Sequence, residues 1–314
     1  MIVMEKAKIE KLIIIGSGPA GLTAAIYGAR GNLIPLVIAG REAGGQLILT
    51  SDVDDYPGFD QGIQGPELMA RMRKQAERFN TRFINEDVVS IDLKTRPFLI
   101  KTENHELRTK SLIIATGASA MWLGLPSEER FRGKGVSACA VCDGFFFKDK
   151  SVIVVGGGDA AMREVQYLSK ICKNVTVVHR RDVFRAQPAL IEQVKGKPNV
   201  KFLFNTTIVE FLGQDKLAGV RLKSTRDGSL SEMTIDGVFV AIGHKPNTDF
   251  LKGQLELDEK GYVVRQPADE THTKVPGVFV AGDVSDRRYR QAVTAAGAGC
   301  KAVFDVEEYL ENLR

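Results

Sequence analysis

The feature that most constrains the fold of this 314-residue chain is a glycine-rich segment that occurs twice, 140 residues apart. The first copy is KLIIIGSGPAG at residues 11–21, and the second is KSVIVVGGGDAA at residues 150–161. Each begins with a β-branched apolar run, which is typical of a strand buried on both faces of a parallel sheet. Each then turns through glycines into an alanine-rich helical stretch. This order of strand, turn and helix predicts two dinucleotide-binding units.

The segments that follow each turn indicate where the two units end. Apolar runs at residues 111–118 and 237–244 lead into glycines, and we expect them to be the closing strands of the two units. After Pro246 there is no third glycine-rich turn, yet residues 277–283 predict another buried strand and residues 291–313 predict a helix. One strand and one helix are too few for a domain. We therefore expect this tail to complete the first unit.

The expected fold class is α/β, with two Rossmann-like dinucleotide-binding domains and the second inserted in the first. We expect the first domain to comprise residues 1–117 and 246–314, and the inserted domain to comprise residues 118–245. A chain of 314 residues with 44% hydrophobic residues can bury two cores of this size. Within the first domain, the apolar spacing over residues 66–79 predicts a helix with one buried face.

Composition argues against several classes of protein. The formal net charge of +4 is spread along the chain, which is not the pattern of a nucleic-acid binder. The first apolar run, at Leu12, is too short for a signal peptide, and no segment approaches the roughly 20 apolar residues that span a bilayer. Four cysteines in a chain of this length do not form a disulfide scaffold, so we expect a reducing cytoplasm.

In the first turn, Gly16 and Gly18 would allow a tight bend and the close approach of backbone to a pyrophosphate, and Gly21 would let the helix pack on the strand. An ordinary glycine-rich turn is the alternative. A dinucleotide site usually has an acid about 20 residues further on, to bind a ribose hydroxyl. Residues 38–40 contain none, and Glu42 is the nearest candidate. The predicted contacts of the turn itself are Gly16, Gly18, Pro19, Ala20 and Gly21.

The second turn is followed by arginines where an NAD site would have its acid. The strand at residues 174–178 runs into HRRDVFR at residues 179–185. Arginines at this place suit a ribose 2′-phosphate, which favours NADPH over NADH, although a solvated basic loop is the alternative. The predicted contacts of this unit are Gly156, Gly158, Asp159, Ala160, His179, Arg180, Arg181 and Arg185.

Between these landmarks lies a Cys-x-x-Cys pair, Cys139 and Cys142. This spacing allows a reversible disulfide, and one thiol of such a pair commonly has a lowered pKa. A zinc site would need further Cys or His ligands, and the neighbouring sequence has none, so redox chemistry is favoured and no metal site is expected. Asp143 could move protons to and from a thiolate, or it could be an exposed carboxylate in a turn.

Together these motifs closely resemble those of the low-molecular-weight thioredoxin reductases. The motifs are the two turns, CAVCDG at 139–144, HRRDVFR at 179–185, AGD at 281–283 and RQA at 290–292. The resemblance covers essentially the whole chain. It implies FAD in the first domain, NADPH in the inserted domain and oxidised thioredoxin as the protein substrate. It also implies a homodimer.

The same resemblance implies roles for individual residues. Cys142 would lie beside the flavin and receive electrons, and Cys139 would attack the disulfide of thioredoxin. Asp143 would be the general acid and base. Phe145 and Phe146 would offer thioredoxin an apolar contact, and core packing is the alternative for either one. The further cofactor contacts that we predict are Glu42, Gly45, Gln46, Asp55, Ala115, Thr116, Gly117, Gly243, Gly282, Asp283, Arg290, Gln291 and Ala292.

Three positions depart from the pattern of that family. Ala160 replaces a hydroxyl that could meet a pyrophosphate, and Arg163 stands where a glutamate is usual. Asp55 replaces an asparagine near the flavin, where an added negative charge would oppose flavin reduction. These departures leave two alternatives open. One is a related dithiol oxidase, or a disulfide reductase with another electron donor, and the other is a redox sensor that does not turn over.

Overall fold

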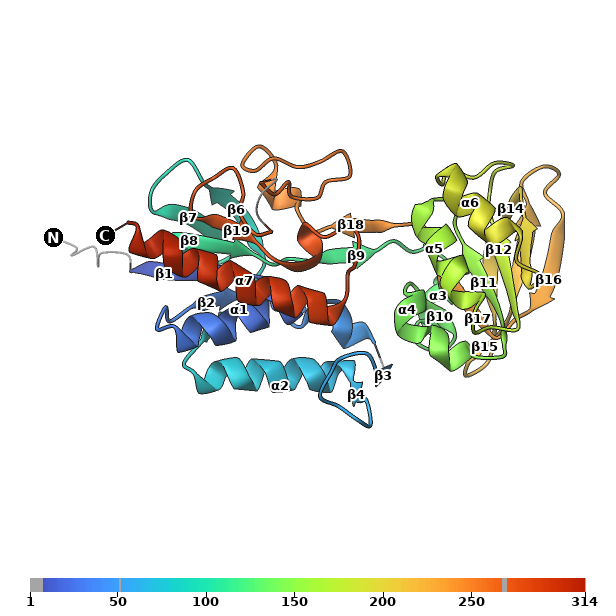
Figure 1. The fold of residues 1–314 in the computed structure, drawn as a ribbon, viewed down its shortest axis with the longest axis horizontal. Helices are drawn as coiled ribbons and strands as arrows, with labels where there is room; N and C mark the ends of the chain where they lie inside the picture. The colour runs from blue at the N-terminus through green and yellow to red at the C-terminus, as the bar shows by residue number, and fades with distance from the viewer. Residues whose placement is uncertain (1–7, 51, 267–269, 314) are drawn as a thin grey trace. The chain divides into compact units, whose positions relative to one another are not determined.

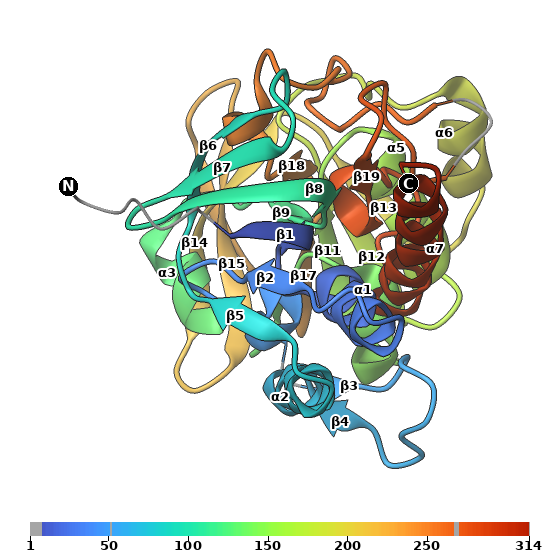
Figure 2. The ribbon, with the colours of Figure 1, turned by 90° about the vertical axis from the view of Figure 1, so that its left-hand side faces the viewer.

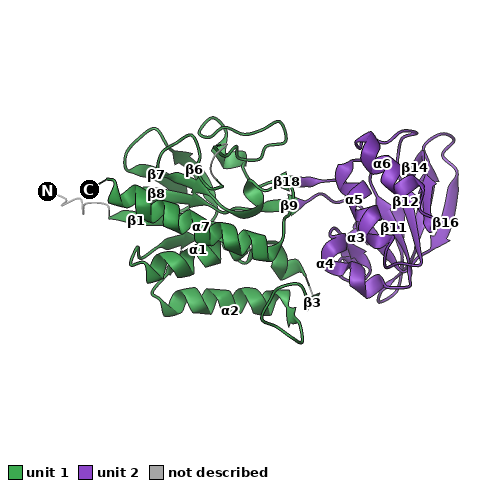
Figure 3. Cartoon of the chain, viewed as in Figure 1, with its two compact units in different colours: residues 1–119, 245–314 green, residues 120–244 purple. Residues whose placement is uncertain are grey.

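The computed structural model describes residues 8–50, 52–266 and 270–313, and the chain divides into two compact units (Figure 3). Unit 1 comprises residues 1–119 and 245–314, and unit 2 comprises residues 120–244. The two segments that connect the units pair with each other as short strands. These strands are β9 (Ala118–Ala120) and β18 (His244–Pro246).

Unit 1 is built on a seven-stranded sheet (Figure 2). Strand β1 pairs in parallel with β2 and β8, β2 pairs with β5, and β8 pairs with β19, so that five strands form a parallel core. The first part of β8 also pairs with β7 in an antiparallel hairpin, which β6 extends. The strands are β1 (Ile9–Ile15), β2 (Leu36–Ile38), β5 (Arg82–Ile84), β6 (Val88–Asp92), β7 (Phe98–Thr102), β8 (Glu106–Ile114) and β19 (Val278–Val280).

Both faces of this sheet are covered, which explains the uninterrupted apolar run of β1. Leu12 and Ile14 point into a core formed with helix residues such as Ala24 and Val303, and all four are at most 1% exposed. Ile13 and Ile15 point to the opposite face, where they join a second core that includes Phe98 of β7. A strand in this position needs side chains that can be buried on either face.

Three helices cover one side of unit 1, with α1 between α7 and α2 (Figure 1). Their bounds are α1 (Pro19–Arg30), α2 (Gly65–Arg78) and α7 (Ala292–Glu311). The buried face of α2 carries Leu68, Met69, Met72 and Ala76, as the apolar spacing predicted. The unit is completed by the strand pair β3 (Asp52–Val53) and β4 (Ile63–Gln64) and by the 3₁₀ turns Gly45–Leu49, Asp249–Leu251 and Gly282–Val284.

Unit 2 repeats the parallel arrangement of unit 1. Its larger sheet has five strands, all parallel, in the order β10-β17-β11-β12-β13. Their bounds are β10 (Val136–Ser137), β17 (Gly237–Val240), β11 (Ser151–Val155), β12 (Asn174–Val178) and β13 (Val200–Leu203). The edge strand β10 therefore occupies the place in this sheet that β19 occupies in unit 1.

The sheet of unit 2 is also covered on both faces. Val152 and Val154 of β11 pack with residues of the helical layer, and Ile153 and Val155 pack against a three-stranded antiparallel sheet. The strands of that sheet are β14 (Thr206–Gly213), β15 (Leu217–Ser224) and β16 (Leu230–Thr234). The helices are α3 (Pro126–Phe131), α4 (Ala140–Asp143), α5 (Asp159–Leu168) and α6 (Pro188–Lys195), and a 3₁₀ turn spans Gly144–Phe147.

These sheets confirm the predicted fold class, an α/β protein in which one Rossmann-like unit is inserted in another. The structure adds the β14–β16 sheet and the β6–β7 hairpin, which the sequence patterns did not predict. Within the described residues, no helix is both long enough and apolar enough to cross a membrane.

Candidate functional site

The first glycine-rich turn connects β1 to α1 and leaves one side of its backbone open. A Cβ on Gly16 would lie 2.2 Å from the carbonyl oxygen of Ala115, and one on Gly21 would lie 2.0 Å from the carbonyl oxygen of Gly16. No atom lies within 4 Å of the position where a Cβ of Gly18 would stand. Helix α1 has no side-chain cap, so its first N–H groups can bind an anionic group. The turn fits the pyrophosphate of a dinucleotide.

Ser17 ties this turn to two neighbouring segments. Its buried hydroxyl donates to the carbonyl oxygen of Ala39 at 2.8 Å and accepts from the backbone N–H of Gly44 at 2.9 Å. Gly45 follows directly and lies against Gly18, with 3.2 Å between its would-be Cβ and the Gly18 Cα. The predicted contacts Gly45 and Gln46 are thus part of a segment held at the turn. Sequence reasoning missed Ser17 because its two bonding partners are distant in the chain.

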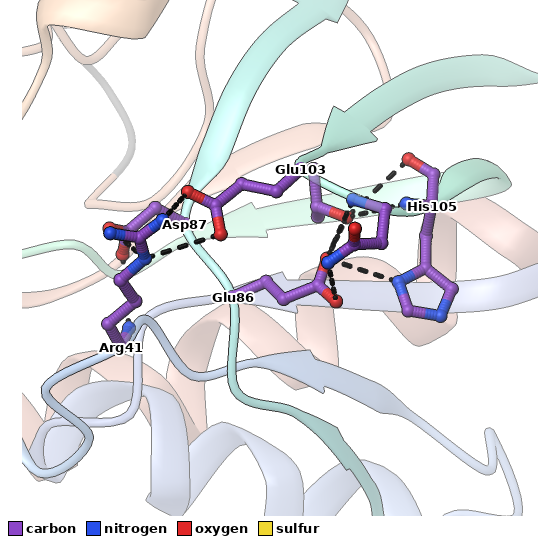
Figure 4. A network of polar contacts seen from close by, with 7 residues as sticks. Arg41, Glu86, Asp87, Glu103 and His105 are labelled. Atoms are coloured by element: carbon purple, nitrogen blue, oxygen red, sulfur yellow. Dashed lines mark hydrogen bonds and ion pairs between the residues drawn. The ribbon is translucent and has the colours of Figure 1, made fainter.

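The predicted ribose ligand Glu42 is exposed and follows a residue that is held by acids (Figure 4). The backbone N–H of Arg41 donates to Asp87 Oδ1 at 3.1 Å, and its guanidinium pairs with Glu103. The segment before β6 is held as well, because Thr102, Asn104 and His105 form hydrogen bonds with the carboxylate of Glu86. These hydrogen bonds lower the pKa of Glu86 to about 2. This network fixes the backbone next to Glu42.

The closing strand β8 leads to Ala115, Thr116 and Gly117 beside the first turn. The Thr116 hydroxyl donates to the carbonyl oxygen of Asn247 at 2.8 Å, and the Asn247 amide donates to the carbonyl oxygen of Thr116 at 2.9 Å. Asn247 therefore fastens the returning chain to the end of β8, a role that the sequence did not indicate. Asp55, by contrast, is exposed in the loop between β3 and β4.

The C-terminal contacts predicted for the flavin lie between β19 and α7. Gly282 adjoins α1, because its would-be Cβ lies 3.0 Å from the Ala20 Cβ. Burial raises the pKa of Asp283 to about 7, an effect that Asp286 reinforces and Arg290 opposes. Gln291 caps α7, which begins at Ala292, through a reciprocal pair of bonds with Thr294.

The second turn has the same construction in unit 2. A Cβ on Gly156 would lie 2.5 Å from the carbonyl oxygen of Ala241, and the position of a Gly158 Cβ has no atom within 4 Å. Helix α5 starts at Asp159 without a side-chain cap, and Ala160 is half-buried in its first turn. The closing segment beyond β17 includes Gly243, which has a φ of +121°. This turn also fits a pyrophosphate.

The arginine segment, residues 179–185, lies beside the second turn. Arg180, Arg181 and Arg185 are exposed, and within the described part of the chain no acidic side chain forms an ion pair with them. The backbone N–H of Arg185 donates to the carbonyl oxygen of Gly157 at 2.7 Å, which brings the segment against the turn. Three free guanidinium groups at this place could bind a phosphate dianion.

His179 is turned inward, unlike these arginines. Its Nε2 lies 3.0 Å from the carbonyl oxygen of Val183, and a Cβ on Gly157 would lie 2.3 Å from its ring. Burial lowers the pKa of His179, as do the charges of the nearby arginines, against the effect of the Val183 bond. The neutral ring therefore packs between the arginine segment and the second glycine-rich turn.

The redox pair begins two residues after the end of the edge strand β10. Cys139 and Cys142 form a disulfide across the first turn of α4, with their Cα atoms 5.4 Å apart. The Cys139 sulfur accepts a hydrogen bond from the backbone N–H of Cys142 at 3.2 Å, and the Ser137 hydroxyl accepts one from the N–H of Cys139 at 3.0 Å. Asp143 is half-buried at the end of α4.

Apolar side chains stand exposed around the disulfide. Phe145 is 65% exposed, Val141 51% and Phe146 39%, although each belongs to a type that is usually buried. The structure thus places the predicted docking phenylalanines on the surface next to the reactive pair. In the described residues there is no group of three or more His, Cys, Asp and Glu side chains that could hold a metal ion.

Comparison with known proteins agrees with this arrangement. The pyridine nucleotide-disulphide oxidoreductase family matches residues 10–299. The chain belongs to this family. Membership implies a flavin and a pyridine nucleotide as its redox cofactors, and it makes the protein an oxidoreductase.

Individual members of the family are similar over almost their full length. A thioredoxin reductase from Coxiella burnetii is 52% identical over 99% of both chains. A protein from Pseudomonas fluorescens named glucosaminate ammonia-lyase is 48% identical over 99% of both chains. The solved thioredoxin reductase from Giardia duodenalis has a TM-score of 0.92 and 44% identity, covering 96% of this chain and 98% of its own. Relatives at this level place the chain in the bacterial-type thioredoxin reductase group that its motifs predicted.

Proposed function

We propose that the protein is a thioredoxin reductase, which uses NADPH and FAD to reduce the disulfide of thioredoxin. The observation that carries the proposal is the Cys139–Cys142 disulfide, which lies in the same unit as a glycine-rich turn and an arginine segment. A disulfide beside exposed phenylalanines is accessible to a protein partner.

The two cofactors are assigned to different units. The first turn, together with Gly45, Ala115 and the Gly282–Asp283 segment, supports FAD in unit 1. The second turn and the three exposed arginines support NADPH in unit 2, because guanidinium groups suit a 2′-phosphate. When bound, FAD and NADPH supply the two electrons that reduce the protein disulfide.

The reduced cysteine pair then carries out thiol–disulfide exchange. The thiolate of Cys139 attacks one sulfur of the thioredoxin disulfide, forms a mixed disulfide and releases the first thioredoxin thiolate. The thiolate of Cys142 attacks the Cys139 sulfur, which restores the enzyme disulfide and releases the second thiolate. Asp143, one residue beyond Cys142, accepts protons from the enzyme thiols and delivers them to the leaving thiolates.

A direct assay tests this function. The purified protein should contain flavin and should oxidise NADPH only when oxidised thioredoxin is present. The Pseudomonas fluorescens relative is named glucosaminate ammonia-lyase, and this name gives the competing activity. Release of ammonia from glucosaminate is therefore measured in parallel. Ammonia release without thioredoxin reduction would replace our proposal, and NADPH-independent oxygen consumption with dithiols would favour the oxidase.

Two serine variants test the order of the cysteines. The probe is a thioredoxin that keeps one active-site cysteine, blocked with thionitrobenzoate. Cys142→Ser should react with it through Cys139 and retain the mixed disulfide. Cys139→Ser should react at least about tenfold more slowly, because Cys142 would not be the attacking thiol. Faster reaction of Cys139→Ser would reverse the assignment.

We also propose that the protein forms a homodimer in the cytoplasm, as the family resemblance implies. Light scattering after gel filtration should give about twice the mass of one chain. A monomer at micromolar concentration would contradict this proposal. The cytoplasmic location agrees with a chain of this length that has only four cysteines and so no disulfide scaffold.

A further inference from the structure

A β-hairpin of unit 2 contacts the main chain of the arginine segment. The last residue of β15 and the turn that leads to β16, residues 224–229, are called the hairpin tip here. It lies at one end of the β14–β16 sheet and belongs to neither glycine-rich turn. Residues of this tip and of the β13–β14 turn bind three consecutive carbonyl groups of the arginine segment.

Those three bonds hold the backbone that carries the arginines. The N–H of Thr206 donates to the carbonyl oxygen of His179 at 3.0 Å, and the N–H of Asn205 donates to that of Arg181 at 3.1 Å. The Thr225 hydroxyl donates to the carbonyl oxygen of Arg180 at 3.3 Å. The three bonds use only carbonyl oxygens of the main chain. The side chains of Arg180 and Arg181 therefore remain available to a ligand.

The hairpin tip also brings a fourth guanidinium group to this place. The N–H of Thr225 donates to the carbonyl oxygen of Asn205 at 2.7 Å. With the Asn205 amide oxygen oriented toward Arg226, that oxygen accepts from Nε and Nη2 of Arg226, each at 3.0 Å. Asn205 thus contacts both Arg181, through its backbone, and Arg226, through its side chain.

The charge of Arg226 is not neutralised within the described residues. Arg221, on the same hairpin, pairs with Glu210 and Glu232, whereas no ion pair joins Arg226 to an acid. The neighbouring Asp227 is engaged elsewhere, because its carboxylate accepts hydrogen bonds from the N–H and the hydroxyl of Ser229. Hydrogen bonds with Ser224 and Ser229 lower the pKa of Asp227 to about 2. An exposed arginine anchored by an amide is oriented but keeps its charge for an anion.

We propose that the hairpin tip is part of the site that selects the 2′-phosphate, with Arg226 as a fourth cationic contact and with Asn205 and Thr225 as positioning residues. This inference rests on the proposed use of NADPH. Binding energy would then come from two segments about 45 residues apart in sequence, the arginine segment and the hairpin. The sequence motif HRRDVFR covers only the first of them.

Calorimetric titration of the flavin-loaded protein tests the proposal with two probes, adenosine 2′,5′-bisphosphate and adenosine 5′-monophosphate. Arg226→Gln should weaken binding of the bisphosphate about fivefold and leave the monophosphate unchanged. The matched control is Lys216→Gln, which removes the same charge at the opposite end of β15. It should affect neither probe.

The positioning role is tested with two substitutions at one residue. Thr225→Val removes the hydroxyl that binds the carbonyl oxygen of Arg180, and it should lower the preference for bisphosphate over monophosphate. Thr225→Ser retains a hydroxyl and should restore that preference. A general loss of stability would weaken both probes alike, so the ratio of the two affinities reports on the site.

The outcomes separate this inference from the function on which it rests. If the unmodified protein does not prefer the bisphosphate, the NADPH assignment fails and the inference fails with it. If it does prefer the bisphosphate but Arg226→Gln and Thr225→Val leave the preference unchanged, the hairpin tip has no part in selection and only this inference is overturned.

Discussion

The two glycine-rich turns have the same backbone construction but differ in what packs on their middle residue. In unit 1 the middle residue is Ser17, whose hydroxyl bonds the segments after β2 and before the first 3₁₀ turn. In unit 2 it is Gly157, and the ring of His179 occupies the space that a side chain would need. One turn is held by a hydroxyl and the other by an imidazole.

This difference teaches how one scaffold can receive two cofactors. At the flanking positions, Gly16 and Gly156, a side chain would collide with the carbonyl groups of Ala115 and Ala241, so both positions require glycine. They shape the backbone and are common to both units. In both units the segment after the second strand lies against the turn, and the middle residue decides how that segment is held there. In unit 2 that segment carries the arginines.

The edge strands extend the comparison. Strand β19 of unit 1 and β10 of unit 2 occupy the same place in the parallel order, and each is followed within three residues by a chemically special residue. After β19 comes Asp283, a carboxyl group with a raised pKa, and after β10 comes Cys139 of the disulfide. Equivalent ends of the two sheets thus serve different chemistry.

The largest expected effect concerns the last position of the turn, where unit 1 has Gly21 and unit 2 has Ala161. Gly21→Ala should destabilise unit 1 by about 3 kcal/mol or more and abolish flavin retention, because its methyl group would lie 2.0 Å from the Gly16 carbonyl oxygen. Ala161→Gly should cost only about 1 kcal/mol. Urea unfolding measures the stability of each variant, and the ratio of flavin to protein absorbance measures the flavin that it retains. Similar losses for the two variants would show that the turns are not built differently at this point.

The buried acid of unit 1 should give that unit a pH dependence. The pKa of Asp283 is about 7 when folded and about 3.9 when unfolded. The folded state therefore holds its proton more tightly, so stability falls as pH rises from about 4 to 7. In flavin-free protein, Asp283→Asn should raise the free energy of unfolding at pH 8 by up to a few kcal/mol, and by almost nothing at pH 4. A pH-independent difference would contradict the raised pKa.

The arginine segment should matter for one cofactor only. Arg181→Gln should raise the Michaelis constant for NADPH about ten- to a hundredfold and change that for NADH little, since a hydrogen bond to a charged group contributes about 1.5–3 kcal/mol. Flavin content should not change. Lys201→Gln, an exposed cation on β13, is the control. Equal effects on NADPH and NADH would remove the 2′-phosphate assignment.

The smallest expected effect is on the middle residue of the first turn. Ser17→Ala leaves a buried N–H of Gly44 and the carbonyl group of Ala39 without their partner, at a cost of about 1–2 kcal/mol. Flavin should dissociate about tenfold more readily, as fluorescence on dilution would show. The Michaelis constant for NADPH serves as the internal control. Unchanged flavin affinity would mean that Ser17 does not hold the turn.

The sequence predicted what depends on local pattern. The turns, the closing strands and the buried face of α2 follow from glycine spacing and apolar periodicity, and the structure has them. Ser17, Asn247 and Thr225 were missed, because each acts through bonds to residues far along the chain. His179 was predicted as a cofactor contact from its place after the strand, and only the tertiary structure shows that its ring lies on Gly157.

The division of unit 1 into two stretches of chain has a consequence for the order of events during synthesis. Strand β8 ends at Ile114, but its neighbour β19 begins at Val278, and unit 2 lies between them as one continuous stretch. Unit 2 can therefore acquire its fold while the ribosome is still making the remainder. The sheet of unit 1 must wait for nearly the whole polypeptide. Until then its incomplete edge is exposed, and this is the interval in which the nascent protein is most open to aggregation or to capture by a chaperone.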